Sequence, residues 1–148
     1  MAEPDYGTMS DHEATALRGY LLKGGFVSFD DFRDDSRNGV MGWATFEQQM
    51  KRGIPNARFI DLDPSFPIFH SFFEINTFNI IPQAYDNNRA ILRGLLEDND
   101  PKMRMLAMIN FNPDISDFWE LANDFCLVSQ DNETNKLGVN SVIYALTH

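Results

Sequence analysis

Apolar residues near the start of the chain recur first at helical spacing and then at strand spacing. Residues 10–13 have the pattern of a capping box, in which Ser10 caps the helix start and Glu13 reaches back to it. The helix that follows carries apolar residues on one face, at Ala14, Leu17 and Leu21. The glycines at residues 24–25 end this helix, and the mostly apolar residues 26–29 predict a short buried strand.

A second helix and a second strand follow a polar stretch. Residues 33–42 are polar and rich in turn-forming residues, which predicts a loop that could act as a mobile lid. Three large apolar residues then recur at helical spacing, namely Trp43, Phe46 and Met50. Gly53 and Pro55 end this helix, and residues 58–62 alternate as a strand does. The order of elements to this point is helix, strand, helix, strand.

The middle of the chain contains an apolar segment without one period, followed by a hairpin pattern. Residues 66–81 contain only Glu74 as a charged residue and follow neither the strand nor the helix repeat throughout. We therefore expect an irregular, packed flap or short helical turns there. Residues 90–96 and 103–111 are apolar runs joined by a turn-forming cluster at residues 97–101, which predicts an antiparallel hairpin.

Two further helices are predicted to complete a single domain that spans residues 1–148. Asp114 is expected to cap a helix that runs through Trp119 and Leu121. The last helix is predicted for residues 133–146, and its apolar residues lie on so many sides that we expect it to be largely buried. The pattern favours an α/β fold, a three-layer sandwich on a mixed, mostly parallel sheet with a late antiparallel hairpin. The alternative is an α+β arrangement.

Composition and charge narrow the classes of function. With 43% hydrophobic residues and 148 residues in all, the chain can build its own core. A net charge of -10 without a basic cluster makes nucleic acid and anionic membrane poor partners, and no apolar run could span a bilayer, so we expect a soluble segment. The single cysteine, Cys126, excludes an internal disulfide and a zinc site of paired thiolates. No phosphate-binding loop or dinucleotide fingerprint is present, so no cofactor is expected.

Several stretches together resemble a bacterial domain-of-unknown-function family with a class I glutamine amidotransferase-like fold. The stretches are Glu3-Pro4, residues 10–32, Trp43 with Phe46, Phe69-His70, residues 104–110, Asp114 with Trp119-Glu120, and residues 138–147. The resemblance implies a sandwich of the amidotransferase or flavodoxin type, distantly similar to the trehalose-utilisation-like branch. Such domains are often the C-terminal part of larger envelope proteins, which implies a periplasmic or membrane-associated parent protein.

The chain departs from the family pattern in two ways. Relatives usually have a further strand-forming region upstream of Glu3-Pro4, so we expect either a fragment or a shortened member. An exposed strand edge, a protein partner or a homo-oligomer could follow from that. Active amidotransferases also present a Gly-x-Cys-x-Gly elbow, whereas Cys126 lies in Asp124-Phe125-Cys126-Leu127, so amidotransfer is not expected.

The strongest candidates for chemistry follow the first strand. Ligands of open α/β sheets bind outside the carboxyl ends of the strands, and Asp30 and Asp31 lie at such an end. Adjacent carboxylates could bind a divalent cation or act as acid and base. The alternative is that Asp30 caps or turns the following loop while Asp31 faces water.

Two other positions could contribute polar groups to a site. His70 lies within the apolar segment and could be a ligand or a proton shuttle, although a hydrogen-bonded histidine without a chemical role is the alternative. Trp119 and Glu120 could supply an aromatic platform and a carboxylate for a sugar or similar ligand. The alternative is that Trp119 belongs to the core and Glu120 to the surface.

Besides an assembly element whose missing upstream strand comes from another subunit or from a second copy, the sequence leads to two hypotheses about function. The first is a non-catalytic ligand- or protein-binding module without a metal site, with binding residues at Phe32, Trp43, Phe69, Asn110, Asp114 and Trp119. The second is a carboxylate-dependent hydrolase for a small polar or carbohydrate substrate, with catalytic residues at Asp30, Asp31, His70 and Glu120.

Overall fold

The computed structural model describes residues 7–32, 42–79, 81, 90–120 and 128–148. Their strands form a four-stranded sheet in the order β1-β4-β3-β2. The strands are β1 (Val27–Phe29), β2 (Phe59–Asp61), β3 (Leu92–Leu96) and β4 (Met105–Asn110). The chain is therefore a mixed α/β protein, as the pattern of helices and strands predicted.

The directions of the strands differ from the expectation of a mostly parallel sheet. β1 and β4 pair in parallel, but β3 runs antiparallel to both of its neighbours, β4 and β2. The late hairpin between β3 and β4 is confirmed. Its connection contains the short 3-10 helix η3 (Glu97–Asn99), where Asp98 and Asn99 have positive φ angles and reverse the chain. A connection this short forces antiparallel pairing, because a parallel pair needs a longer crossover.

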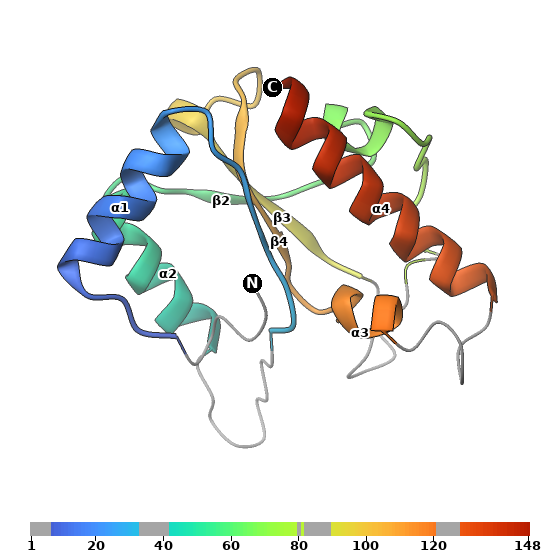
Figure 1. Ribbon diagram of the computed structural model, residues 1–148, viewed down its shortest axis with the longest axis horizontal. Coiled ribbons are helices and arrows are strands. Elements are labelled where there is room, and N and C mark those ends of the chain that lie inside the picture. The colour runs from blue at the N-terminus through green and yellow to red at the C-terminus, as the bar shows by residue number, and fades with distance from the viewer. Residues whose placement is uncertain (1–6, 33–41, 80, 82–89, 121–127) are drawn as a thin grey trace.

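Helices lie on both sides of the sheet (Figure 1). One side carries α1 (Asp11–Leu22) and α2 (Gly42–Gly53), and the other carries α3 (Ile115–Glu120), α4 (Val128–Thr147) and the 3-10 helix η2 (Pro67–His70). Each side has its own apolar cluster: Leu21 and Phe46 belong to the first, and Phe69 and Leu137 to the second. The central strand β4 is buried along its whole length, since it supplies both clusters.

The signals at the ends of the first helix are confirmed. Ser10 accepts a hydrogen bond from the Glu13 backbone, and the Glu13 carboxylate accepts one from the Ser10 backbone, which is the predicted capping box. Gly24 has a φ of 105°, a left-handed conformation that side chains rarely adopt. The chain can therefore turn directly from α1 into β1.

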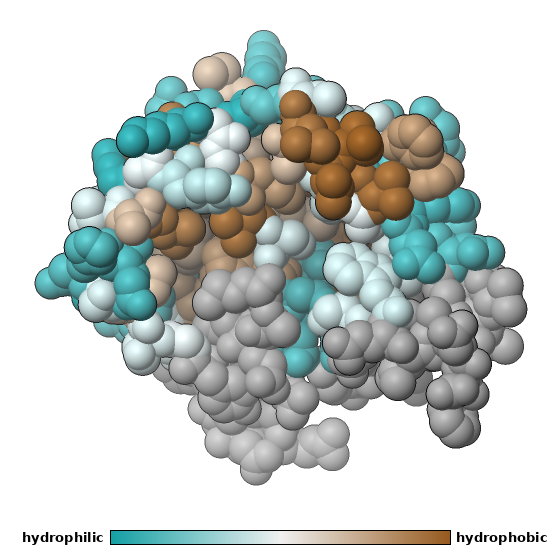
Figure 2. Space-filling view, viewed as in Figure 1, coloured by the Kyte–Doolittle hydropathy of each residue, from teal (hydrophilic) through white to brown (hydrophobic). Residues whose placement is uncertain are grey.

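The last helix was predicted too short and too deeply buried. It begins at Val128 and buries only one face, through Leu137 and Tyr144 among others, while Leu146 is 78% exposed. Figure 2 shows apolar surface over the C-terminal half of α4, where Val139, Val142 and Leu146 are exposed. The apolar residues surround the helix, but the sheet covers only the side against which α4 packs.

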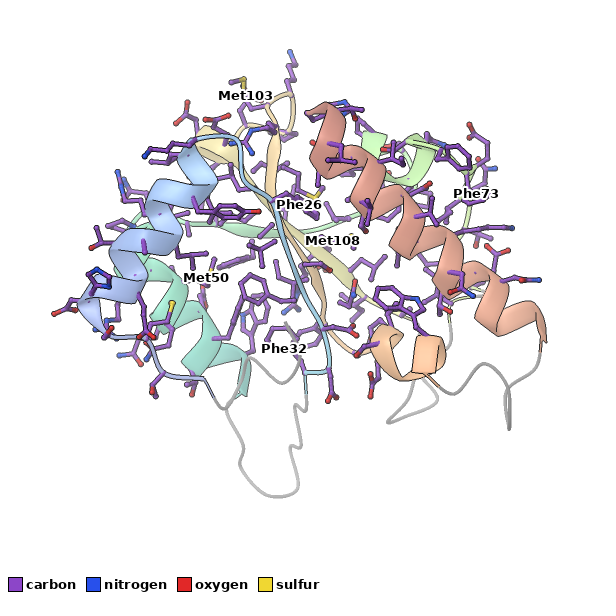
Figure 3. The ribbon with its side chains drawn as sticks, viewed as in Figure 1. Phe26, Phe32, Met50, Phe73, Met103 and Met108 are labelled. Atoms are coloured by element: carbon purple, nitrogen blue, oxygen red, sulfur yellow. The ribbon has the colours of Figure 1, made fainter. Side chains whose placement is uncertain are left out.

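Within the apolar segment, residues 66–79 are irregular as expected, with η2 near their start. Asn140 of α4 holds the segment, because its Oδ1 accepts from the backbone N–H of Phe72 and Phe73 and its Nδ2 donates to the Phe73 carbonyl. The side chain of Phe73 lies beside α4 (Figure 3). Residues 33–41, most of the predicted lid, lie outside the described residues.

Phe69 was expected to bind a ligand, but it is 0% exposed and packs against Phe78 with the ring centroids 4.8 Å apart. Its ring is part of the core. A ligand entering from solvent cannot reach a ring that its neighbours cover completely.

Replacing Phe69 with alanine should lower the free energy of unfolding by about 3–5 kcal/mol, because it removes a buried ring and leaves a cavity. Phe72→Ala is the matched control, since Phe72 is 65% exposed and should change stability by less than about 1 kcal/mol. Urea unfolding of both variants measures the difference. Equal losses would mean that Phe69 does not belong to the core.

Candidate functional site

Three strands of the sheet end at one edge. β1 is parallel to β4, and β2 also runs in this direction because both β2 and β4 are antiparallel to β3. Asp30 directly follows β1, and Asn110 is the last residue of β4. These polar side chains are both buried and lie next to each other at the carboxyl ends of a parallel pair, the position where ligands of open α/β sheets bind.

The Asp30 carboxylate accepts hydrogen bonds from two other segments of the chain. Its Oδ1 accepts from the Asn110 Nδ2 at 2.9 Å and from the Ile115 backbone N–H at 3.2 Å. Its Oδ2 accepts from the Ser116 backbone N–H at 2.6 Å. Ile115 and Ser116 open α3, so Asp30 caps a helix that lies 85 residues further along the chain.

Asp30 and Asp31 lie in other environments than the alternative interpretation of them expected. Among the described residues, the Asp30 carboxylate accepts its hydrogen bonds from α3 and Asn110, so its role there is to cap α3. Asp31 does not face water, since it is buried and has an interaction partner of its own. Asp31 has a φ of 60°, and this left-handed turn directly after β1 redirects the chain at the edge of the sheet.

Asn110 has one half of its amide paired and the other half unpaired. The side chain is only 2% exposed, and Oδ1 has no hydrogen-bond partner. The amide cannot be turned around to relieve this, because Oδ1 would then face the Asp30 carboxylate, which also only accepts. An unpaired buried acceptor costs about 1–3 kcal/mol, so this oxygen marks a place where a donor is missing.

A cavity of about 200 Å³ opens beside Asn110 between the sheet, α3 and α4. Its lining is mostly apolar and includes Phe26, Met108, Ile115 and Leu137, with Ser28 and Asn110 as polar groups from the sheet. Phe26 and Met108 lie on the side of the sheet that faces α4 (Figure 3). We call this space the α4 cavity.

Trp119 forms part of the wall of the α4 cavity. Its indole N–H donates to the Thr134 carbonyl at 3.1 Å, and the side chain is 46% exposed. A Cβ atom at Gly138 would lie 2.7 Å from the indole ring, so only glycine lets the ring approach α4 this closely. Trp119 is thus not a core residue, which was the alternative to a binding role.

His70 lies in a different part of the molecule from Asp30. Its Nδ1 is 2.6 Å from the Glu74 carboxylate, and its Nε2 is 2.7 Å from the Pro64 carbonyl. The hydrogen bond with Glu74 raises the pKa of His70 above its ordinary value of 6.5, against the opposing effect of burial. Figure 1 places η2 beside the C-terminal half of α4, away from α3, so the structure does not bring His70 to the two aspartates.

The remaining predicted residues divide between the two sides of the sheet. Asp114 is buried, and its carboxylate accepts a hydrogen bond from Ser116 at the start of α3. It lies at the same edge of the sheet as Asp30, Asn110 and Trp119. Phe32 packs in the other cluster, with its ring centroid 4.9 Å from that of Phe46. Trp43 lies on that side too, as shown by its contacts with Phe32 and Phe46. The side chain of Glu120 is outside the described part of the structure.

Sequence reasoning missed the contribution of Ser28 and of α4 to this site. Ser28 was a recognisable signal, because it is the single polar residue in an otherwise apolar strand pattern. Gly138 was another, since a glycine inside an apolar helix often marks close approach of a neighbour. Neither residue indicates by itself which segment approaches it.

Two kinds of feature are absent from the described residues. No group of three or more histidine, cysteine, aspartate or glutamate residues in these ranges could hold a metal ion. None of the helices, as far as the structure describes them, is both long and apolar enough to cross a membrane.

Comparison with known protein families gave a match over nearly the whole chain. The family model described as "Domain of unknown function (DUF4159)" matches residues 1–146. No curated protein matched the chain.

Asp30→Ala should lower the free energy of unfolding by about 2–4 kcal/mol, because it removes a helix cap and leaves buried donors without their acceptor. Asp63→Ala is the matched control, since Asp63 follows β2 as an exposed aspartate that accepts from the Ser65 backbone. Its loss should be much smaller. Urea unfolding tests both variants, and an unchanged stability of Asp30→Ala would refute the capping role.

The raised pKa of His70 makes its ion pair with Glu74 stabilising in acid. The contribution is complete below about pH 6.5, where the unfolded chain is protonated too, and is lost as the pH rises through the higher folded-state pKa. His70→Gln should therefore reduce the amount by which stability at pH 5.5 exceeds stability at pH 8.5. His12→Gln makes the same change at an exposed residue of α1 and should reduce this difference less than His70→Gln does.

Proposed function

The chain belongs to the DUF4159 family, and we propose that this member is a non-catalytic binding module for a small ligand in the α4 cavity. The single observation that carries the proposal is that Asn110, whose buried Oδ1 has no hydrogen-bond partner, is one of the residues that line an apolar cavity. A buried acceptor without a partner is costly, and a ligand that supplies the missing donor would offset that cost on binding.

The lining of the α4 cavity determines the class of ligand. Phe26, Met108 and Leu137 offer apolar contact, whereas the Asn110 oxygen accepts one hydrogen bond. An apolar cavity of about 150 Å³ holds benzene, so about 200 Å³ accommodates a ring with a small substituent. The proposed ligand is therefore an apolar ring or chain that carries one hydroxyl or N–H group.

The use of the Asp30 carboxylate supports binding over hydrolysis. Both of its oxygens accept hydrogen bonds that hold α3 and Asn110 in place. A general base needs a lone pair directed at the substrate, and protonating this carboxylate would weaken the cap of α3. The absence of His70 from this end of the sheet also removes the proton shuttle that the hydrolase hypothesis required.

We propose in addition that the domain has the amidotransferase-like sandwich that its sequence resembles. The parallel pair β1–β4 with helices on both sides of the sheet supports this arrangement. The location of the α4 cavity at the carboxyl end of that pair supports it as well. In a larger envelope protein, such a module would bind its ligand without converting it into a product.

The experiment uses phenol as the probe and anisole as its partner without a donor. Protein labelled with 5-fluorotryptophan has two ¹⁹F signals, because the chain contains two tryptophans, and Trp119 reports on the α4 cavity. Phenol should shift the Trp119 signal and bind at least about tenfold more tightly than anisole, the value of one hydrogen bond of about 1.4 kcal/mol.

Two variants separate the cavity from the acceptor. Ala145→Leu fills the α4 cavity and should weaken both probes, whereas Ala16→Leu on the exposed face of α1 should weaken neither. Asn110→Leu should abolish the preference for phenol over anisole in a chain that still folds. Equal binding of the two probes by the unmodified chain, or no shift at Trp119, would contradict the proposal.

A further inference from the structure

We infer that the opposite side of the same sheet edge contains a second binding site, specific for a carboxylate carried on a flat apolar group. The site is a cavity of about 360 Å³ between α2, β2 and β3, lined by Trp43, Glu47, Phe59, Asp61, Arg93 and Phe111. We call it the Arg93 cavity. It is separate from the α4 cavity and does not depend on the function proposed there.

Arg93 is held between two aromatic rings. Its guanidinium carbon lies 4.2 Å from the centroid of the Trp43 ring and 3.8 Å from that of the Phe111 ring. The π face of an aromatic ring attracts a cation, so both contacts hold the guanidinium beside these rings. The side chain is 20% exposed.

Most of the hydrogen-bonding capacity of Arg93 is unused within the described residues. Its Nε donates to the Asp61 carboxylate at 3.0 Å, which fixes one side of the group. None of the hydrogen bonds that the described residues form with Arg93 comes from a terminal nitrogen. These nitrogens form the planar fork that matches the two oxygens of a carboxylate.

The lining of the Arg93 cavity has two carboxylates, those of Glu47 and Asp61, and one guanidinium, so the open fork of Arg93 rather than the net charge of the lining favours an anion. Glu47 is paired with Lys51 at 2.7 Å and Asp61 with Arg93, so both acidic groups of the lining already have a cation. A cationic ligand would compete with Arg93 for the same carboxylates and for the same ring faces. A phosphate dianion would meet two carboxylates with a single arginine to offset them. The terminal nitrogens of Arg93 can therefore bind a ligand with one negative charge.

The aromatic residues determine what carries that carboxylate. Trp43 lies at an angle of 81° to Phe59 and 82° to Phe111, so the rings form walls with different orientations around the cavity. A flat apolar group can pack against one ring face and meet the edge of another. An aromatic or unsaturated carboxylic acid fits this lining better than a compact acid such as acetate.

Alternation along the end of β4 explains why the two cavities are independent. Met108 packs with α4, and Ile109 packs with α1 and α2. Asn110 then faces the α4 cavity and Phe111 the Arg93 cavity, as successive residues of a strand do. The sheet therefore separates them, and each can be tested while the other serves as an internal reference.

Benzoate is the probe, and the ¹⁹F signal of 5-fluorotryptophan at Trp43 is the readout. Benzoate should shift the Trp43 signal without shifting that of Trp119. Arg93→Met should weaken benzoate binding at least tenfold, and Arg58→Met, at an exposed arginine before β2, should leave it unchanged. Glu47→Gln removes a negative charge from the lining and should tighten binding by about two- to fivefold.

Further probes test whether the Arg93 cavity selects a carboxylate. Benzylamine should not shift the Trp43 signal, and inorganic phosphate and acetate should not displace benzoate at equal concentration. Equal binding of benzylamine would refute the anionic specificity, and displacement by phosphate would refute the carboxylate fork. If Arg93→Met fails to fold, the Glu47→Gln result decides, because unchanged or weaker benzoate binding there would overturn the site.

Discussion

The hydrogen bonds accepted by the Asp30 carboxylate hold one end of this structure together. They join the end of β1 to Asn110 of β4 and to the first N–H groups of α3. α3 has only six residues, too few to be stable by itself in water, so its position depends on what it is bonded to. The carboxylate gains in return, because a buried charge needs donors around it. Ile115 and Trp119 of α3 reach the α4 cavity only because this cap places the helix there.

The second organising feature is the burial of β4 on both sides. A strand covered by helices on both faces directs neighbouring side chains into different environments, and Asn110 and Phe111 consequently serve different cavities. The mixed directions of the strands bring the ends of β1, β2 and β4 to one edge. The α4 cavity and the Arg93 cavity therefore lie at the same edge of the sheet, on opposite sides of it.

Each cavity contains a polar group with unused hydrogen-bonding capacity. At the α4 cavity an amide oxygen lacks a donor, and at the Arg93 cavity a guanidinium has donors to offer. Proteins usually pair such groups internally, since leaving them unpaired costs stability. Where local rules of stability are broken in this way, a functional role is the first hypothesis to test. Apolar walls make both groups more effective, because a hydrogen bond is stronger where water is excluded.

Much of the local structure of this protein could be predicted from its sequence, because local hydrogen bonds and side-chain periods determine it. The capping box at Ser10, the left-handed Gly24 and the hairpin of β3 and β4 depend on residues close together in the chain. Asp30 and Asn110 were singled out from the sequence as site residues, but the hydrogen bonds between them and to α3 were not predicted. Two of the hydrogen-bond partners of Asp30 lie 80 and 85 residues further along the chain. Which strands become neighbours is decided only when the chain packs. The same reason explains the errors: the burial of Phe69 and the exposure of Leu146 depend on what covers each residue, and only the tertiary structure decides that.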